Sequence, residues 1–158
     1  MLQFTIFSIL TLVLVLLFFS LKKSTHPLLL LFILMVSEFL FTTFISIIVD
    51  NGHRWKVTEE LTHFIMFRLL EVIFIPFLLL LYIECINRGN SSRTTLLLSI
   101  VWTLICMLVE YGAIKLNIFH HERWEYWMSF IFWSSFLLIL AIVHAIFSKQ
   151  LRREGISI

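Results

Sequence analysis

Ionisable side chains within long apolar segments are the residues of this chain best placed to do chemistry. Glu38, Glu71 and Glu110 each lie inside a run of hydrophobic residues, and Arg68 precedes Glu71 by three positions. That spacing places Arg68 and Glu71 on one face of a helix and predicts an ion pair between them. A charge in hydrocarbon costs about 2.5–3.5 kcal/mol on insertion scales, so each of these groups needs a partner or a function.

The depths of these residues along their segments predict one polar cluster near a membrane face. At 1.5 Å per residue, Glu71 and Glu110 lie about 10–12 Å below that face, with Arg68 and Lys115 nearer to it. Glu38 lies deeper, near the midplane. We therefore expect Glu110 to be paired through Arg68 or Lys115. The predicted cluster consists of Glu38, Arg68, Glu71, Glu110 and Lys115.

Three interpretations of the cluster are open at this point. Its charges can lock neighbouring helices in register, without any ligand. Alternatively, desolvation keeps Glu38 or Glu110 uncharged, so that it binds a proton, a cation or a polar solute. In the third interpretation a charge pairs with the helix of a partner subunit. Pro76 lies mid-segment, where it removes a backbone hydrogen bond to Val72 and predicts a kink that could serve as a hinge.

Histidines form a second candidate site. His53, His63, His120 and His121 fall near Glu59, Glu60 and Glu122, and imidazole and carboxylate groups together can bind a divalent metal. The spacing does not form a His-Glu-x-x-His helix, and Glu60-x-x-His63 occurs once, whereas a di-iron bundle needs two such pairs. The sequence therefore favours solvated histidines and predicts no metal or cofactor. A membrane enzyme with a metal at this interface is a further alternative.

Five apolar segments must position these residues, at about 4–21, 27–49, 64–86, 95–118 and 126–148. Each is long enough for a helix to cross about 30 Å of hydrocarbon. Hydrophobic residues make up 60% of the 158 residues, more than a soluble domain of this size can bury. The sequence predicts an all-α, polytopic membrane protein, a bundle of five transmembrane helices forming a single domain over 1–158.

Basic residues at the segment ends predict the orientation. Seven cations follow the first, third and fifth segments, whereas the opposite side carries fewer cations and more acids. By the positive-inside rule the N-terminus is outside and the C-terminus cytoplasmic. We expect a multi-pass protein of the cell membrane, in a bacterium the cytoplasmic membrane. The seven cations are Lys22, Lys23, Arg88, Arg93, Lys149, Arg152 and Arg153.

Small residues on the fifth segment predict how the protein meets partners. Ser134, Ala141 and Ala145 would let another helix approach closely, and little chain lies outside the bilayer. The leading hypothesis is therefore a non-enzymatic accessory, regulatory or assembly subunit, bound to another membrane protein or to a second copy. We expect lipid around it and no nucleic-acid partner. The alternative is a proton-linked carrier or small channel that uses Glu38, Glu71 and Glu110.

The five-segment layout and the aromatic start of the last segment carry a resemblance. Residues 120–130 read HHERWEYWMSF, and the whole chain is about 160 residues long. In these features it resembles small multi-pass membrane proteins of spore-forming Bacillus- and Clostridium-type bacteria. The resemblance implies a bacterial cytoplasmic membrane protein and carries no established activity with it.

Overall fold

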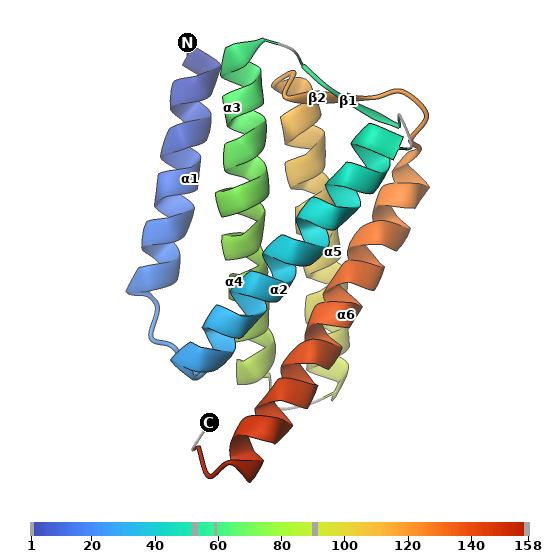
Figure 1. Cartoon of the computed structure of the whole chain (residues 1–158). Coiled ribbons are helices and arrows are strands. Elements are labelled where there is room, and N and C mark those ends of the chain that lie inside the picture. The colour runs from blue at the N-terminus through green and yellow to red at the C-terminus, as the bar shows by residue number, and fades with distance from the viewer. Residues whose placement is uncertain (1, 52–53, 59, 90–91, 157–158) are drawn as a thin grey trace.

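The computed structural model describes residues 2–51, 54–58, 60–89 and 92–156, most of them helical. Five helical segments are long and apolar enough to cross a membrane, which confirms the predicted number of spans. The spans pack as one bundle, and the first begins at the end opposite to the one where the last finishes (Figure 1). They run Leu2–Ser20, Pro27–Val49, Leu61–Arg88, Arg93–Lys115 and Tyr126–Arg153.

The elements that build these spans are ten in the described part of the chain. In order they are α1 (Leu2–Ser20), α2 (Pro27–Ser46), the π-helical η1 (Ile47–Asn51), β1 (Trp55–Val57), α3 (Leu61–Leu69), the π-helical η2 (Leu70–Phe74), α4 (Ile75–Arg88), α5 (Ser92–Lys115), β2 (Phe119–His121) and α6 (Tyr126–Arg153). We call the end of the bundle at which β1 and β2 lie the strand end. The opposite end, which carries the seven cations named above, is the basic end.

Two short strands correct the purely helical prediction. β1 and β2 pair antiparallel, with Trp55 opposite His121 and Val57 opposite Phe119. The connection between α2 and α3 is thereby tied to the connection between α5 and α6 (Figure 1). Trp55 stacks on Phe119, with ring centroids 4.5 Å apart, and both rings are buried. The two loops therefore form an aromatic cover over the strand end instead of separate polar turns.

The third span is the centre of the bundle. In its most apolar stretch 56% of the residues are buried, compared with 17–28% in the other four spans. Tyr82 and Leu79 of α4 are fully buried, while large apolar residues such as Leu12, Leu97 and Leu138 are exposed on the outer helices. An outward apolar surface of this kind suits a hydrocarbon solvent. α2 crosses diagonally in front of the central span (Figure 1).

Two helix ends follow recognisable rules. Asn117 adopts a left-handed backbone with φ 56°, and the N–H of Ile118 reaches back to the carbonyl of Ala113. Gly155, with φ 77°, ends α6 in the same way. Both are Schellman-type stops, in which a residue that tolerates positive φ reverses the chain. The fourth span consequently ends at Lys115, three residues before the predicted boundary.

The irregularity predicted at Pro76 takes the form of a π-helical turn. In η2 the N–H of Ile75 bonds the carbonyl of Leu70, five residues back. A wider turn of this kind accommodates a proline, which lacks an N–H and crowds the carbonyl four residues earlier. Glu71 lies within this turn, so the local backbone geometry sets where its carboxylate points.

Candidate functional site

Glu110 is a buried carboxylate that accepts hydrogen bonds from another helix of the bundle. From α6, the hydroxyl of Ser129 donates to Oε1 at 2.5 Å and the indole N–H of Trp133 donates to Oε2 at 2.7 Å. From β2, His121 Nε2 lies 3.0 Å from Oε1. Glu110, Ser129 and Trp133 are all buried. Three elements therefore converge on one carboxylate, which joins α5, α6 and the strands.

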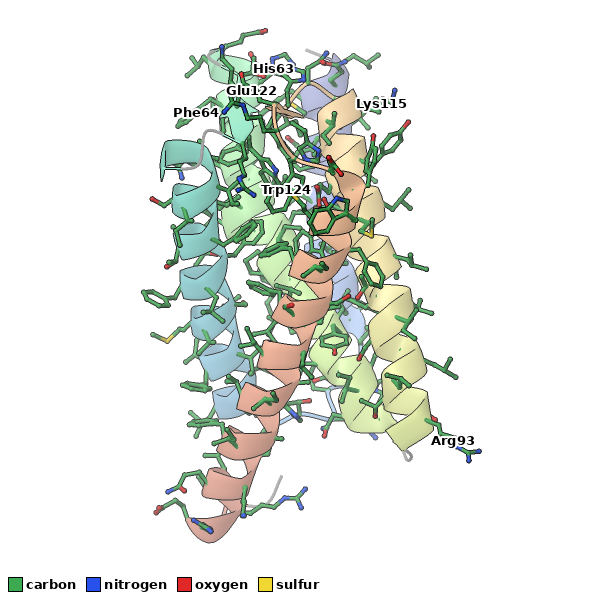
Figure 2. All side chains as sticks on the ribbon, turned by 90° about the vertical axis from the view of Figure 1, so that its right-hand side faces the viewer. His63, Phe64, Arg93, Lys115, Glu122 and Trp124 are labelled. Carbon is green, nitrogen blue, oxygen red and sulfur yellow. The ribbon has the colours of Figure 1, made fainter. Side chains whose placement is uncertain are left out.

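Aromatic rings enclose this carboxylate from the strand end. His121 stacks beside Trp55, with centroids 5.4 Å apart, and meets Trp124 edge-on at 6.4 Å. The indole N–H of Trp124 donates to Ser129 at 2.7 Å, which extends the network by one more bond. Figure 2 shows Trp124 lying across the upper part of α6. The rings exclude water from Glu110, and hydrogen bonds in such surroundings are stronger than in water.

Arg68 and Glu71 form the ion pair that their spacing predicts. Arg68 Nη1 lies 2.7 Å from Glu71 Oε2, and the guanidinium also rests over the ring of Phe64 at 5.2 Å. The pair is asymmetric, because the Glu71 side chain is only 2% exposed and that of Arg68 is 54% exposed. Arg68 therefore stabilises a buried charge from the edge of the bundle, where it lines a groove of about 400 Å³ between α2 and α3.

This asymmetry predicts unequal effects of removing either partner. Arg68→Ala should lower the free energy of unfolding by about 1–3 kcal/mol, because the buried Glu71 carboxylate loses its cation. Adding Glu71→Gln to Arg68→Ala should recover part of that loss. Thermal unfolding in a mild detergent measures both, with Lys115→Ala as the matched control for an exposed cation. A double variant less stable than Arg68→Ala alone would contradict the assignment.

Glu71 and Glu110 face a common buried space that is very small. The cavity they line measures about 10 Å³, close to the minimum volume that holds one water molecule. Its other lining residues are apolar and include Phe41 and Trp133. The two carboxylates are therefore neighbours, as predicted, but each has its own partners.

Among the described residues, Glu38 shares no hydrogen bond with these two networks, and it lies on the outward side of α2. It is half-buried, and its Oε2 is shielded from solvent without a hydrogen-bond partner. The hydroxyl of Thr42, one turn away, interacts with the carboxylate. A shallow groove of about 640 Å³ opens over Glu38, bordered by Met35, Thr42 and Ser46. Of the three predicted carboxylates, Glu38 is the least buried.

The predicted cluster is wrong in two respects, the position of Lys115 and the partners of Glu110. Lys115 is exposed and points away from the bundle (Figure 2), where its ammonium rests over the ring of Tyr111 at 5.3 Å. Glu110 is paired with Ser129, Trp133 and His121, so neither Arg68 nor Lys115 is its partner. Lys115 lies at the helix terminus, where the side chain can reach water or lipid headgroups and gains nothing from burial.

The histidines separate into different surroundings. His63 Nδ1 lies 3.0 Å from Glu60 Oε2, whereas His121 belongs to the Glu110 network and His120 is exposed on β2. His53 and Glu59 lie outside the described residues. Within the described part of the chain, no three His, Cys, Asp or Glu side chains come close enough together to hold a metal ion.

Glu84 is an interior carboxylate whose role sequence reasoning misses. Its position near the end of the third span predicts a side chain that reaches water, yet it is only 2% exposed. It accepts hydrogen bonds from the backbone N–H of Ser24 at 2.9 Å, the Ser24 hydroxyl at 2.8 Å and the N–H of Thr25 at 3.3 Å. Asn87 bonds the carbonyl of Ser24 at 3.1 Å. These contacts clamp the turn between α1 and α2 to α4.

The small residues predicted for helix contact line openings near α6. Ser134 and Ala141 border a cavity of about 520 Å³ between α4, α5 and α6. Ala145 borders a second cavity of about 310 Å³, at the basic end.

Comparison with protein-family models, with curated proteins and with solved structures found no match. The assignment of function therefore rests on the geometry of these polar groups and openings in a helical protein that carries five membrane-spanning candidates.

Proposed function

We propose that this chain is a non-enzymatic accessory or assembly subunit that acts through helix–helix association within the membrane. The observation that carries the proposal is Glu38, a half-buried carboxylate that borders an open groove on the outward face of α2 and whose shielded Oε2 lacks a hydrogen-bond partner. A polar group left unsatisfied beside hydrocarbon is costly, and a donor on a neighbouring helix recovers that cost. In contrast, the carboxylates of Glu71, Glu84 and Glu110 are engaged within the bundle.

The surface around Glu38 provides a continuous docking face. Thr42 and Ser46 of α2 border both the groove over Glu38 and the groove over Arg68 and Glu71. A helix lying there would meet an acceptor at Glu38 and a half-exposed donor at Arg68. The docking face is defined by Glu38, Thr42, Ser46, Arg68 and Glu71.

A second copy of the chain offers the required pattern. The docking face carries a half-buried carboxylate and a half-exposed guanidinium, so two copies related by a two-fold axis would place each Glu38 near the other copy's Arg68. Such isologous contacts are the commonest basis of homodimers. The same pattern of donor and acceptor on a different membrane protein would fit equally well.

We also propose the orientation that the charges favour. The basic end carries seven cations in the sequence, whereas the strand end carries Arg54, Lys56, Lys115 and Arg123 among more numerous acids. The positive-inside rule then places the basic end in the cytoplasm, the N-terminus outside and the docking face toward the outer half of the bilayer. In a bacterium this is the cytoplasmic membrane.

The other two functions have weaker geometric support. A carrier would need a path past Glu71 and Glu110, and the space that these residues share holds about one water molecule. An acyl-transfer enzyme would need a hydroxyl activated by a base. Ser129 does donate to the Glu110 carboxylate, but both residues are buried and the space beside Glu110 has no room for a substrate. Both functions stay predictions.

Site-specific photocrosslinking in native membranes tests the proposal. A photoreactive residue at Met35, beside Glu38, should give a discrete protein adduct, and one at the equally exposed Leu97 of α5 should not. Because an interhelical hydrogen bond contributes about 0.6–2 kcal/mol, Glu38→Leu should lower the Met35 adduct about threefold to thirtyfold. Glu122→Gln, an exposed carboxylate at the strand end (Figure 2), should leave it unchanged.

Two results would contradict the proposal. One is equal labelling from Met35 and Leu97, which would mean random collisions in the bilayer. The other is a Met35 adduct that Glu38→Leu leaves at full strength, which would mean that the carboxylate is not part of the contact.

A further inference from the structure

A second feature, independent of the docking face, lies on the other side of the bundle between α5 and α6. The two helices pack against each other, and in the view of Figure 2 they separate toward the basic end. The cavity of about 520 Å³ lies between them, and its volume falls in the ~300–1,000 Å³ range typical of ligand sites. Along α5 it extends from Thr95 to Thr103, about 12 Å at 1.5 Å per residue.

The wall of this groove is mostly apolar, and three of its hydroxyl groups are already hydrogen-bonded. Tyr82 and Ser99 hydrogen-bond each other at 2.9 Å, Ser99 also bonds the carbonyl of Thr95, and Thr103 bonds the carbonyl of Ser99. Their hydroxyls are therefore satisfied within the protein. The remaining lining includes Leu96, Ile100 and Leu138. A hydrocarbon chain would fit such a wall better than a polar solute, which would find these donors already used.

The length and position of the groove match one leaflet of a bilayer. It covers the half of α5 nearest the basic end, from the first turn to the middle of the helix. Half of the ~30 Å hydrocarbon thickness is about 15 Å, close to the 12 Å of the groove. An acyl chain entering from the leaflet at the basic end would therefore fill the groove along its whole length.

A polar pocket adjoins the groove at the basic end. Ala141 borders the groove and Ala145 borders this second cavity of about 310 Å³, so the two openings lie one helical turn apart along α6. The pocket also contains the cations Lys149 and Arg152, neither of which pairs with a carboxylate among the described residues. The pocket is therefore positively charged and lies one helical turn from an apolar groove.

Two buried polar atoms in this pocket lack partners. His144 is only 8% exposed, and its Nε2 has no hydrogen-bond partner; the hydroxyl of Ser148 is also buried without one. The nearby carboxylate of Glu84 is already bonded to Ser24 and Thr25 and therefore does not satisfy them. Native proteins rarely leave such atoms unsatisfied. A ligand with several hydrogen-bonding oxygens would satisfy both.

We propose that this composite site binds an anionic phospholipid. Its phosphate would lie in the pocket against Lys149 and Arg152, with hydrogen bonds to His144 and Ser148. One acyl chain would lie in the groove between α5 and α6. The charge of the pocket favours an anion, and the adjoining groove favours an amphiphile over free phosphate. Basic pockets between membrane helices recognise lipid headgroups by this combination of charge and position.

Lipid binding to the purified chain in detergent micelles, followed by native mass spectrometry, tests the proposal with phosphatidylglycerol as the probe. Each basic residue near a membrane surface contributes about 1 kcal/mol to anionic lipid binding, so Lys149→Ala with Arg152→Ala should weaken binding about 30-fold. Arg153→Ala, next to the pocket but outside it, should change binding little. Ala141→Phe, which fills the groove, should also abolish the binding of phosphatidylglycerol. Ile142→Phe, on the exposed neighbouring face, should leave that binding unchanged.

Three results would overturn the proposal. Equal weakening by Arg153→Ala would show nonspecific attraction to a basic surface. Binding of inorganic phosphate as tightly as phosphatidylglycerol, together with no effect of Ala141→Phe, would show an anion site without a lipid. Photocrosslinking from Ala141 in native membranes to a protein, in place of lipid, would show that a partner helix fills the groove.

Discussion

Glu110→Ala is expected to be the most destabilising single change in the protein, with a loss of about 3–5 kcal/mol. The variant leaves the hydroxyl of Ser129, the indole N–H of Trp133 and the imidazole of His121 without their common acceptor. These groups come from α6 and β2, so the contact between the fourth span, the fifth span and the strands is weakened at once. Thermal unfolding in a mild detergent, together with accumulation in the membrane, measures the loss.

Graded variants at this position separate hydrogen bonding from cavity formation. Glu110→Gln keeps the shape and one acceptor oxygen, so it should cost less than Glu110→Ala. Trp133→Phe removes one donor and leaves the carboxylate with the Ser129 hydroxyl and the nearby His121 imidazole, so it should cost about 1–3 kcal/mol. Glu122→Ala, an exposed carboxylate at the same end, is the control. If Glu110→Ala unfolded no earlier than this control, the network would have no structural role.

Glu84→Ala is expected to release the turn between α1 and α2 from α4. It removes the acceptor for two backbone N–H groups and one hydroxyl, contributed by Ser24 and Thr25. Hydrogen bonds to a charged group contribute about 1.5–3 kcal/mol each, though losses within one network do not add fully. We expect a destabilisation of about 2–4 kcal/mol, and hydrogen exchange at the amides of residues 24 and 25 should become faster.

The exchange measurement distinguishes a local from a global effect. Glu154→Ala, which changes an exposed carboxylate at the same end of the bundle, should leave both the melting temperature and the exchange of these amides unchanged. If Glu84→Ala lowered the melting temperature but left these amides protected until global unfolding, the carboxylate would not be the clamp described above.

The spans and the Arg68–Glu71 pair could be predicted from sequence because both are local. An apolar run of about 20 residues has few alternatives to a membrane helix, and a spacing of three residues fixes two side chains on one face. The boundary near residue 118 moved because Asn117 accepts a left-handed backbone, a signal present in the sequence but weak for asparagine.

The partners of Glu110 and Glu84 could not be predicted in the same way. Ser129 and Trp133 lie 19 and 23 residues from Glu110, and Ser24 lies 60 residues from Glu84. Their contacts depend on how far each helix is rotated about its axis, which apolar periodicity hardly constrains when lipid surrounds every outer face. Depth predicts that Lys115 and Arg68 lie near the same membrane face as Glu110. It does not predict the direction in which each side chain points, and neither cation points toward Glu110.

The sequence also does not predict the two paired strands, β1 and β2. Trp55-Lys56-Val57 alternates apolar and polar residues, as a half-buried strand does, but three residues are too few to outweigh a loop assignment. The buried indole of Trp55 against Phe119 is what stabilises the pairing. That contact joins two loops more than 60 residues apart, and it places His121 beside Glu110. Long-range aromatic packing therefore completes the polar network.

The size of the complex extracted from native membranes by a mild detergent tests the central claim most directly. If Glu38 is an association site and the other interior carboxylates are structural, the wild-type chain will migrate well above its 18.8 kDa monomer with bound detergent. Glu38→Leu will then migrate as the monomer while keeping the wild-type melting temperature. A Glu38→Leu complex of unchanged size would contradict the account.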